Sequence, residues 1–353
     1  MRNILVTGGA GYIGIHTSIL LLEKGFNVIT IDSLINSSLL AIDRLYSSSA
    51  SELNFSKSQL KFLKGDVRDV IFLRKVFLDQ KIAGQPIDMV IHFAGLKAVQ
   101  ESILLPDLYW DNNVNGTIKL LKVMEENECR NIVFSSSATV YCLNEKSPLN
   151  ESSKLLPVDP YGKTKLAVED ILKRLLCNSN SLWKIISLRY FNPIGAHSSG
   201  LFGESPVNTP NNLFPYICEV ANNRREVLSI FGNDWPTPDG TCIRDFIHVM
   251  DLSDGHLAAI NFINKYRDPF FKAINLGTGK GTSVLELVKT FELVNNLKIN
   301  YVFAARRPGD KGVVFANSDL AKDLLKWEPK RNIFNMCKDG WNWQLNNPQG
   351  YQK

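Results

Sequence analysis

Apolar runs of strand length recur through the first half of the chain, at 3–7, 27–31, 59–63, 89–95, 131–137 and 185–191. Several of these runs are continuous rather than alternating, which is typical of parallel strands buried on both faces of a sheet. The stretches between them, such as 12–24 and 116–126, have the apolar spacing of crossover helices. The pattern predicts an α/β fold built on a doubly wound parallel sheet.

Local signals mark where several elements begin and end. Gly25 stands where the first helix should stop, because glycine adopts the left-handed conformation that turns the chain away. Asp159 and Pro160 are typical of an N-cap and a first helical position. The serine-rich segment 46–58 has little periodicity and is expected to be a surface excursion before the third strand.

The character of the chain changes after Phe191. Residues 192–242 are rich in Asn, Pro and Gly and hold one clear helical pattern, near 213–223. A further strand and helix within 243–265 are expected to return to the main sheet. We therefore expect a main domain of residues 1–191, joined by 243–265, and a smaller mixed α/β substrate domain of residues 192–242 and 266–353.

Composition narrows the class of protein. With 44% hydrophobic and 21% charged residues, the chain is an ordinary globular protein rather than a disordered one. The net charge of +5 is spread out, so nucleic acid is not an expected partner, whereas small anionic molecules are. No apolar run approaches membrane-spanning length, and a strand begins too early for a signal peptide, so no membrane association is expected.

Six cysteines form no CxxC pair and no Cys/His cluster at ligand spacing. They therefore suggest neither a disulfide framework nor a metal site. A reducing, cytoplasmic location fits this usage best.

A glycine-rich turn follows the first strand, with Gly8, Gly11 and Gly14 immediately before the first helix. Such glycines allow a tight turn and a close backbone approach, and the helix N-terminus then faces a pyrophosphate. Asp32 ends the second strand, where a carboxylate can bind ribose hydroxyls and repel a 2′-phosphate. The combination predicts a Rossmann-type site for NAD rather than NADP. Asp66, at the end of the third strand, is a candidate adenine contact.

A second constellation contains Tyr161 and Lys165, which lie four residues apart on the helix opened by Pro160 and so share one face. An ammonium beside a phenol favours the phenolate, which would lower the tyrosine pKa toward the range of a general base. Ser137 ends the fifth strand, where a sheet of this kind places its active crevice. Alone, a Tyr-x-x-x-Lys pair is usually an exposed helix pair; with the dinucleotide turn, it predicts a catalytic site.

These strings together resemble a known family. TGGAGYIG (7–14), SSSATVY (135–141) and YGKTK (161–165) resemble the extended short-chain dehydrogenase/reductase family. Further strings are similar to the nucleotide-sugar 4-epimerases of that family: IHFAGLKAV (91–99), DNNVNGT (111–117), RYFNPIGAH (189–197), NNLFPYI (211–217) and IRDFIHVMDL (243–252).

The resemblance implies an activity, the interconversion of UDP-glucose and UDP-galactose through transient oxidation at C4 with tightly bound NAD. Tyr161 is implied to take the proton from the 4-hydroxyl while Ser137 hydrogen-bonds the reacting oxygen. Lys165 is implied to hold the nicotinamide ribose and to lower the tyrosine pKa, assisted by the oxidised ring. Relatives also imply a homodimer formed through the helices that follow Asn112 and Pro160.

The resemblance also implies binding residues. Besides the three glycines, Asp32, Asp66, Tyr161 and Lys165, the set on the cofactor is Tyr12, Ile13, Asn36, Ser37, Val67, Phe93, Ala94, Gly95, Lys97, Asn112 and Phe191. Besides Ser137 and Tyr161, the set on the UDP-sugar is Asn192, Asn212, Leu213, Phe231, Arg244, Arg307, Asp310 and Val314. Arginine forks suit diphosphate oxygens, which gives the two arginines in this set a physical reason.

Val314 stands where members restricted to unmodified hexoses carry tyrosine. A smaller side chain leaves room for a 2-acetamido group, so activity on UDP-N-acetylglucosamine and UDP-N-acetylgalactosamine is expected as well. A local shift of the turn, or another side chain in the gap, would remove this expectation. Cys142, Ser33 and Phe246 also depart from the family pattern, which puts individual contacts in doubt but not the reaction.

Two alternatives share parts of this pattern. A nucleotide-sugar 4,6-dehydratase would have the same fold, cofactor and Tyr/Lys pair, but it needs an Asp-Glu pair after the strand-end threonine, and 137–141 holds no carboxylate. A non-catalytic NAD-binding regulator would not need Tyr161, Lys165 and Ser137 together. Both alternatives are therefore disfavoured.

Overall fold

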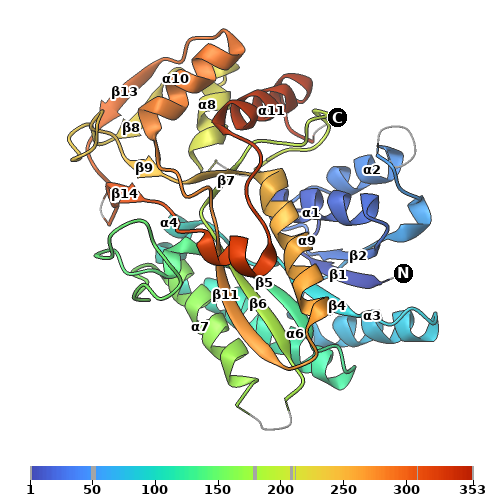
Figure 1. Ribbon diagram of the computed structural model, residues 1–353. Helices are drawn as coiled ribbons and strands as arrows, with labels where there is room; N and C mark the ends of the chain where they lie inside the picture. Colours follow the sequence, from blue (N-terminus) through green and yellow to red (C-terminus); the bar gives the residue numbers. More distant parts are fainter. Residues whose placement is uncertain are drawn as a thin grey trace.

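The computed structural model describes residues 2–48, 53–177, 181–206, 210, 212–307 and 309–351. Within this part of the chain, seven strands form one parallel sheet in the order β11-β6-β5-β4-β1-β2-β3 (Figure 1). Their bounds are β1 (Asn3–Thr7), β2 (Asn27–Asp32), β3 (Leu60–Lys64), β4 (Met89–His92), β5 (Asn131–Ser137), β6 (Lys184–Tyr190) and β11 (Phe270–Leu276). The predicted doubly wound α/β sheet is confirmed.

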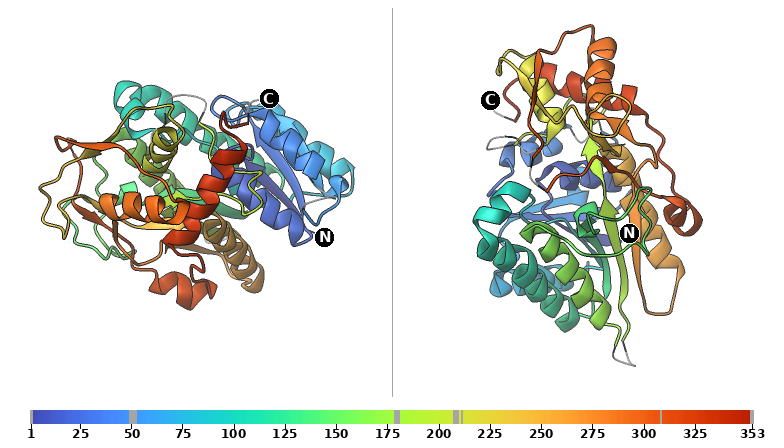
Figure 2. Two further views of the ribbon diagram at one scale, coloured as in Figure 1. Left: turned by 90° about the horizontal axis from the view of Figure 1, so that it is seen from above. Right: turned by 90° about the vertical axis from the view of Figure 1, so that its left-hand side faces the viewer.

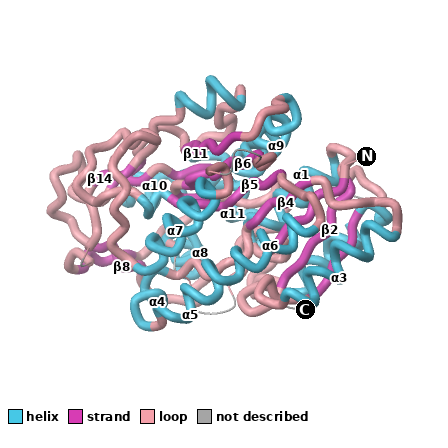
Figure 3. Tube along the Cα trace, turned by 90° about the horizontal axis from the view of Figure 1, so that it is seen from below, coloured by secondary structure: helices cyan, strands magenta, loops and turns pink. Residues whose placement is uncertain are grey.

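Helices cover both faces of this sheet, as Figure 3 shows from below. Their bounds are α1 (Tyr12–Glu23), α2 (Leu39–Ser48), α3 (Val70–Ile82), α4 (Val99–Leu104), α5 (Pro106–Trp110), α6 (Gly116–Glu126), α7 (Pro160–Arg174) and α9 (Val249–Lys265). A π-helical turn (Asp111–Asn115) joins α5 to α6, and short 3-10 turns lie at Lys57–Gln59 and Ala138–Val140.

The continuous apolar pattern of the strands follows from this double cover. Along β1, the side chains of Ile4 and Val6 join one core cluster with α1 and α9. Leu5, between them, points the other way and joins a second cluster with α3, α6 and α7. Because successive strand residues face opposite sides, burial on both faces requires an apolar residue at every position.

The predicted ends of two helices are confirmed. Gly25, after α1, has φ +82°, the left-handed conformation expected of it. The carboxylate of Asp159 accepts a hydrogen bond from the Gly162 amide at 2.8 Å, and Pro160 opens α7. The expected surface excursion from residue 46 is wrong at its start, since residues 46–48 complete α2, where Leu45 is buried.

Apart from a π-helical turn that packs against α9 and β11, the remaining elements lie at one end of the sheet, above the carboxyl ends of its strands (Figure 2). Here β7 (Asn192–Ile194) pairs with β10 (Phe246–His248), and β8 (Leu228–Phe231) pairs with β13 (Tyr301–Ala304). A small sheet has the order β12-β9-β14. The other bounds are α8 (Leu213–Ala221), β9 (Ile243–Arg244), β12 (Thr282–Ser283), α10 (Val284–Asn295), β14 (Val313–Val314), a π-helical turn (Ala321–Leu325) and α11 (Ile333–Asn346).

Two expectations about the domain boundaries need correction. Residues 270–276, assigned to the smaller domain from the sequence, form edge strand β11 of the main sheet and pair in register with β6. Conversely, β9 and β10 do not return to the main sheet, because they pair with short strands of the smaller part. Helix α9 does return, and its residues join the core beside α1. The division into two domains stays a proposal, with α9 and β11 in the main one.

No helix in the described ranges is both long enough and apolar enough to cross a membrane.

Candidate active site

A cleft of about 590 Å³ opens at the carboxyl ends of the central strands. Parallel sheets of this type place their ligand sites there, because the strand-to-helix turns leave a crevice. All residues expected to contact the cofactor line this cleft, together with Ser137, Asn192 and Asn212. Residues far apart in sequence therefore meet in one cavity, while their individual binding roles remain predictions.

The glycine turn lies so close to neighbouring backbone that side chains would not fit at two of its positions. Gly8 has φ +70°, and a Cβ there would lie 2.8 Å from the backbone nitrogen of Ala94. A Cβ on Gly14 would lie 2.2 Å from the carbonyl oxygen of Gly8, so neither position has room for a side chain. Gly11 is the N-cap of α1 and provides no side-chain cap, which leaves the first-turn amides directed at the cleft.

Asp32 is held firmly at the end of β2. Its carboxylate accepts hydrogen bonds from the amides of Ala10 (3.0 Å) and Leu34 (2.9 Å) and from the hydroxyl of Ser37 (2.8 Å). The side chain is buried beside the glycine turn. A fixed negative charge thus stands at the position where a dinucleotide would place its adenosine ribose.

Asp66 has a partner that the sequence did not indicate. Its carboxylate forms an ion pair with Arg68 at 2.7 Å, and Arg68 also pairs with Asp111 at 2.9 Å. The hydrogen bond from Arg68 lowers the pKa of Asp66, so this carboxylate is ionised in the neutral range. Asp66 lines the cleft with its charge already paired.

Tyr161 and Lys165 share one face of α7, as the helix spacing predicts. Both line the cleft together with Ser137, at the end of β5. The Lys165 ammonium donates to the carbonyl oxygen of Ser135 at 2.8 Å and lies 5.7 Å from the centre of the Tyr161 ring. Burial lowers the pKa of Lys165 to about 8.

The pKa of Tyr161 is shifted in the direction opposite to the expected one. Burial raises the pKa of Tyr161 to about 12; a hydrogen bond with Ser137 acts to lower it, and the charge of Asp159 acts to raise it. The loss of hydration outweighs any attraction from Lys165, a balance set by tertiary structure.

Most of the expected sugar-nucleotide residues do not line the cleft. Leu213, Phe231, Arg244, Arg307, Asp310 and Val314 are absent from its lining. Five of them nevertheless contact one another: Arg244 forms an ion pair with Asp310, and Arg307 lies 3.5 Å from the same carboxylate. The Arg307 guanidinium lies 4.7 Å from the centre of the Phe231 ring. Val314 pairs in register with Arg244. The structure thus gathers a second, largely self-paired cluster.

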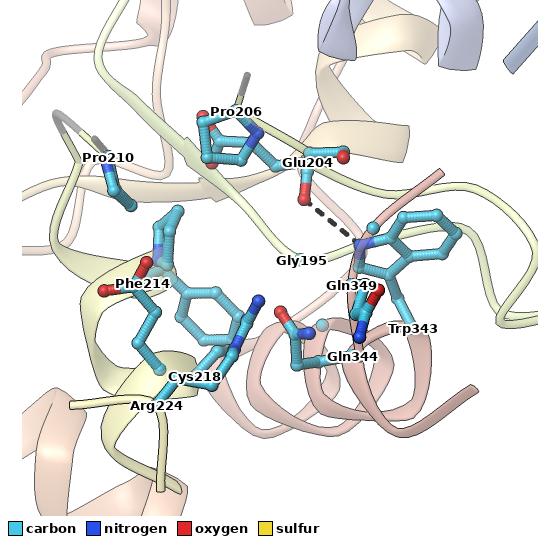
Figure 4. Close-up of a pocket in the computed structure, with 15 residues that line it drawn as sticks. Gly195, Glu204, Pro206, Pro210, Phe214, Cys218, Arg224, Trp343, Gln344 and Gln349 are labelled. Carbon is cyan, nitrogen blue, oxygen red and sulfur yellow. Dashed lines mark hydrogen bonds between the residues drawn. The ribbon is translucent and has the colours of Figure 1, made fainter. Parts of the chain in front are cut away.

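Glu204 is a cleft residue that sequence reasoning missed. Its carboxylate accepts from the Lys97 ammonium and from the Asn212 amide, each at 3.0 Å. Its own carbonyl oxygen accepts from the indole nitrogen of Trp343 at 3.1 Å, the dashed contact in Figure 4. Glu204 thereby joins a residue expected on the cofactor to one expected on the sugar nucleotide. It lies in a loop, 107 positions after Lys97, so no local pattern indicates this bridge.

Two of the departures from the family pattern are buried residues, and one of them, Phe246, also lines the cleft. Cys142 is buried, and its amide donates to the Lys154 carbonyl at 2.9 Å. Phe246 is buried in the core beneath α8, α10 and α11. Among the described residues, no group of three or more His, Cys, Asp and Glu side chains is arranged to hold a metal ion.

Comparison with known proteins adds to this geometry. Residues 5–340 match the family model described as GDP-mannose 4,6 dehydratase. UDP-glucose 4-epimerase 1 of Oryza sativa subsp. japonica is 50% identical over 352 residues, which are 99% of this chain and 97% of the relative. UDP-glucose 4-epimerase 2 of Arabidopsis thaliana is 49% identical, with 99% and 97% covered.

The chain belongs to the UDP-glucose 4-epimerase family.

Solved structures of this epimerase family superimpose on the whole fold. UDP-glucose-4-epimerase from Stenotrophomonas maltophila, with bound NAD and formylated UDP-arabinopyranose, has a TM-score of 0.92 at 41% identity and covers 99% of both chains. The enzyme from Bifidobacterium longum, in complex with NAD⁺ and UDP, has a TM-score of 0.89 at 42% identity, with 99% of this chain and 100% of that chain covered.

Membership of the epimerase family also bears on the dehydratase alternative. The matching family model carries a dehydratase description, yet the strand end and turn at 137–141 hold no carboxylate. The relatives that are about half identical over the whole chain are epimerases. The epimerase interpretation is therefore retained.

Proposed function

We propose that the protein interconverts UDP-glucose and UDP-galactose by oxidising and re-reducing C4 with NAD held in the cleft. The observation that carries this proposal is the meeting of the glycine turn and the Tyr161, Lys165 and Ser137 group in one cavity of a chain of this family. A regulator would need the turn but not the catalytic group.

The residues present fit NAD. Gly8 and Gly14 leave a cradle that a Cβ would fill, and the uncapped N-terminus of α1 faces it. Asp32 supplies a fixed carboxylate that suits ribose hydroxyls and repels a 2′-phosphate. Protein denatured after purification should therefore release NAD or NADH; stoichiometric NADP in the extract would contradict the role of Asp32.

The chemical step would use the residues at the mouth of β5 and α7. Bound NAD supplies the acceptor and donor for hydride at C4, and its positively charged ring favours the Tyr161 phenolate. Tyr161 takes the proton of the 4-hydroxyl, and Ser137 donates a hydrogen bond to the reacting oxygen. Lys165, fixed by the Ser135 carbonyl, holds the nicotinamide ribose and stabilises the phenolate. After the 4-keto sugar rotates about its link to the diphosphate, hydride would return to the opposite face of C4, and Tyr161 would return the proton to the C4 oxygen.

The self-paired cluster would bind the nucleotide end of the substrate. Arg244 and Arg307 carry guanidinium forks that suit diphosphate oxygens, and both contact Asp310. A diphosphate would compete with that carboxylate, which would free Asp310 to bind a ribose hydroxyl. Asn212, at the N-cap of α8, lines the cleft and donates a hydrogen bond to the cleft residue Glu204.

A wider substrate range is part of the proposal. Val314 is half-buried and packs against the cluster of Val140, Tyr141, Leu149 and Phe191. Of these four residues, Phe191 also lines the cleft. The UDP-Glc/GlcNAc 4-epimerase from Campylobacter jejuni has a TM-score of 0.81 at 32% identity, with 98% and 100% coverage. Valine in place of a phenol ring supports activity on N-acetylated sugars alongside UDP-glucose and UDP-galactose.

A homodimer and a cytoplasmic location are also proposed. Large apolar side chains gather on the outer helices α4 to α6, with Leu104 79% and Trp110 46% exposed. A second copy packing there would remove this surface from water. All six cysteines are free, which suits a reducing compartment. Sedimentation equilibrium tests the dimer, and Leu104→Glu should weaken it.

The direct test incubates purified protein with UDP-galactose and no added NAD. UDP-glucose should appear up to the equilibrium ratio, because the cofactor stays bound and is regenerated in each cycle. A 4-keto-6-deoxy product would favour the dehydratase alternative. No conversion by protein that contains NAD would overturn the proposal.

A further inference from the structure

A buried ion pair lies beneath the catalytic group. Glu169 follows Lys165 by one turn of α7 and Tyr161 by two, so the three side chains share one face. Glu169 is 0% exposed, and Arg189 of β6, its partner at 2.6 Å, is 1% exposed. Two charges removed from water in this way are costly unless every hydrogen-bonding position is filled.

The carboxylate of Glu169 has four donors. One oxygen accepts from the hydroxyls of Ser136 (2.6 Å) and Ser187 (3.0 Å) and from Arg189 Nε (2.9 Å), and the other accepts from Arg189 Nη2. Burial acts to raise the pKa of Glu169, but the bonds and charge of Arg189 outweigh it, and the net direction is downward. The pair is therefore ionised, and it connects α7 to β5 and β6.

Ser136 connects this pair to the reacting groups. It is the middle member of three consecutive serines at the end of β5. The carbonyl oxygen of Ser135 holds the Lys165 ammonium, and the hydroxyl of Ser137 bonds Tyr161. Ser136, which lies between them, donates a hydrogen bond to Glu169. β5 therefore cannot shift along α7 without breaking this buried charge-assisted bond.

Arg189, the other member of the pair, is connected by a chain of hydrogen bonds to the segment that bears Val314. Arg189 Nη1 donates to the Tyr141 hydroxyl at 3.0 Å, and that hydroxyl donates to Asn275 Oδ1 at 2.6 Å. The Asn275 amide in turn donates to the Leu149 carbonyl at 2.9 Å, and the Leu149 amide bonds the Phe315 carbonyl at 2.9 Å. Phe315 directly follows β14, which carries Val314.

We infer that Glu169 and Arg189 are positioning residues, which act through Ser136 and Tyr141 to hold the Ser137, Tyr161 and Lys165 group in register with the segment that bears Val314. The inference rests on the proposed function. A purely stabilising role would not require ions, because well-packed apolar residues of similar volume usually stabilise a core at least as well.

The first experiment substitutes Glu169→Gln and measures kcat, KM and the pH profile of kcat with UDP-galactose. We expect kcat to fall roughly 10–100-fold with KM changed little, because the reacting groups are displaced rather than removed. The acidic limb of the profile should move upward by about half a pH unit or more, since Tyr161 loses support from Ser137 and Lys165. Asp159 acts to raise the pKa of Tyr161, and Tyr161 in turn acts to raise the pKa of Tyr109 and of Tyr190; the substitution changes none of these groups.

The matched control is Asp251→Asn. Asp251 is also buried and paired, with Arg331 at 2.5 Å, but it lies on α9 and outside the cleft lining. This variant should lose thermal stability while it keeps the parent pH profile and kcat. Equal loss of kcat in both variants, without a shift of the profile in Glu169→Gln, would reduce the pair to a stabilising one and overturn the inference.

A gentler comparison serves if Glu169→Gln fails to fold. Ser136→Ala and Ser187→Ala each delete one buried hydroxyl that donates to the same oxygen of Glu169. Only Ser136 stands between Ser135 and Ser137, so only Ser136→Ala should shift the pH profile. Identical profiles in the two variants would contradict the inference. If the parent protein itself fails to epimerise, the proposed function is wrong; if the parent is active and the variants do not differ, only the positioning role is wrong.

Discussion

The two sides of the site differ in how far the protein prepares them for a ligand. On the cofactor side, a glycine turn, a fixed carboxylate at Asp32 and an uncapped helix N-terminus already line one cleft. On the sugar-nucleotide side, Arg244 and Arg307 share Asp310 and lie outside that cleft. A prepared surface loses little freedom on binding and holds its ligand tightly, whereas a self-paired surface must exchange partners each time.

This difference matches the demands of the proposed reaction. The cofactor is regenerated in each cycle and has no need to leave, whereas the sugar nucleotide must enter, turn over and leave. Substitutions on the two sides should therefore separate the chemical step and cofactor retention from substrate affinity.

The largest effect is expected at the chemical centre, for Tyr161→Phe. Loss of the phenolic hydroxyl removes the proton-transfer group while the ring still fills its place, so epimerisation should fall by roughly 10²–10⁴-fold. NAD content per protein chain, measured after denaturation, should match the parent. Near-normal turnover in this variant would end the proposed role of Tyr161.

Lys165→Met is expected to have the next largest effect, about 10²-fold at neutral pH. Lys165 is charged below its pKa of about 8, and removing that charge raises the tyrosine pKa further. The phenolate then forms only at higher pH, so activity should recover in part as the pH rises. Lys163→Met, at an exposed position of the same helix, is the control and should behave as the parent. No recovery at high pH would indicate lost cofactor positioning instead.

Arg244→Gln tests the sugar-nucleotide side. Losing a charge-assisted contact to the diphosphate should raise the KM for UDP-galactose roughly 10–100-fold, with a smaller change in kcat and unchanged NAD content. Arg306→Gln is the matched control, because Arg306 pairs with Asp234 and stacks on Trp235 nearby. Loss of NAD from Arg244→Gln, or an equal rise of KM in both variants, would show that the two sides are not separable.

The smallest effect is expected for Val314→Tyr. A phenol ring at this position should lower kcat/KM for UDP-N-acetylgalactosamine by about tenfold or more and leave UDP-galactose within a few-fold. The ratio of the two kcat/KM values, in parent and variant, measures the effect. If the parent ignores N-acetylated sugars, or the variant uses them equally well, Val314 does not control access.

The sequence predicts best the elements that are buried on both faces and the site residues that follow local spacing rules. β1 and β5 have the bounds that the sequence predicts, because both faces of each strand are buried, which leaves three adjacent apolar residues in each, ILV and IVF. The edge strand β11 is fully buried only in its last three residues, so its hydrophobic pattern did not place it in the main sheet. β9 and β14 have two residues each, which is too short for a hydrophobic pattern to identify a strand. The cofactor turn and the Tyr161 and Lys165 pair follow local rules of spacing.

The remaining site features depend on contacts distant in sequence. Glu204 contacts Lys97 across 107 positions, and Arg189 meets Glu169 from a different element. The raised pKa of Tyr161 reflects burial that helix spacing cannot express. The sugar-nucleotide residues were assigned by resemblance alone, and their contacts with substrate stay predictions.

The central claim is that hydrogen leaves C4 to a permanently held cofactor and returns to the same carbon. UDP-galactose labelled with deuterium at C4 tests it directly, when incubated in ordinary water with purified protein and no added NAD. The account predicts UDP-glucose that retains the deuterium at C4, as measured by mass spectrometry and NMR. Loss of the label to solvent, or a requirement for added NAD at every turnover, would contradict it.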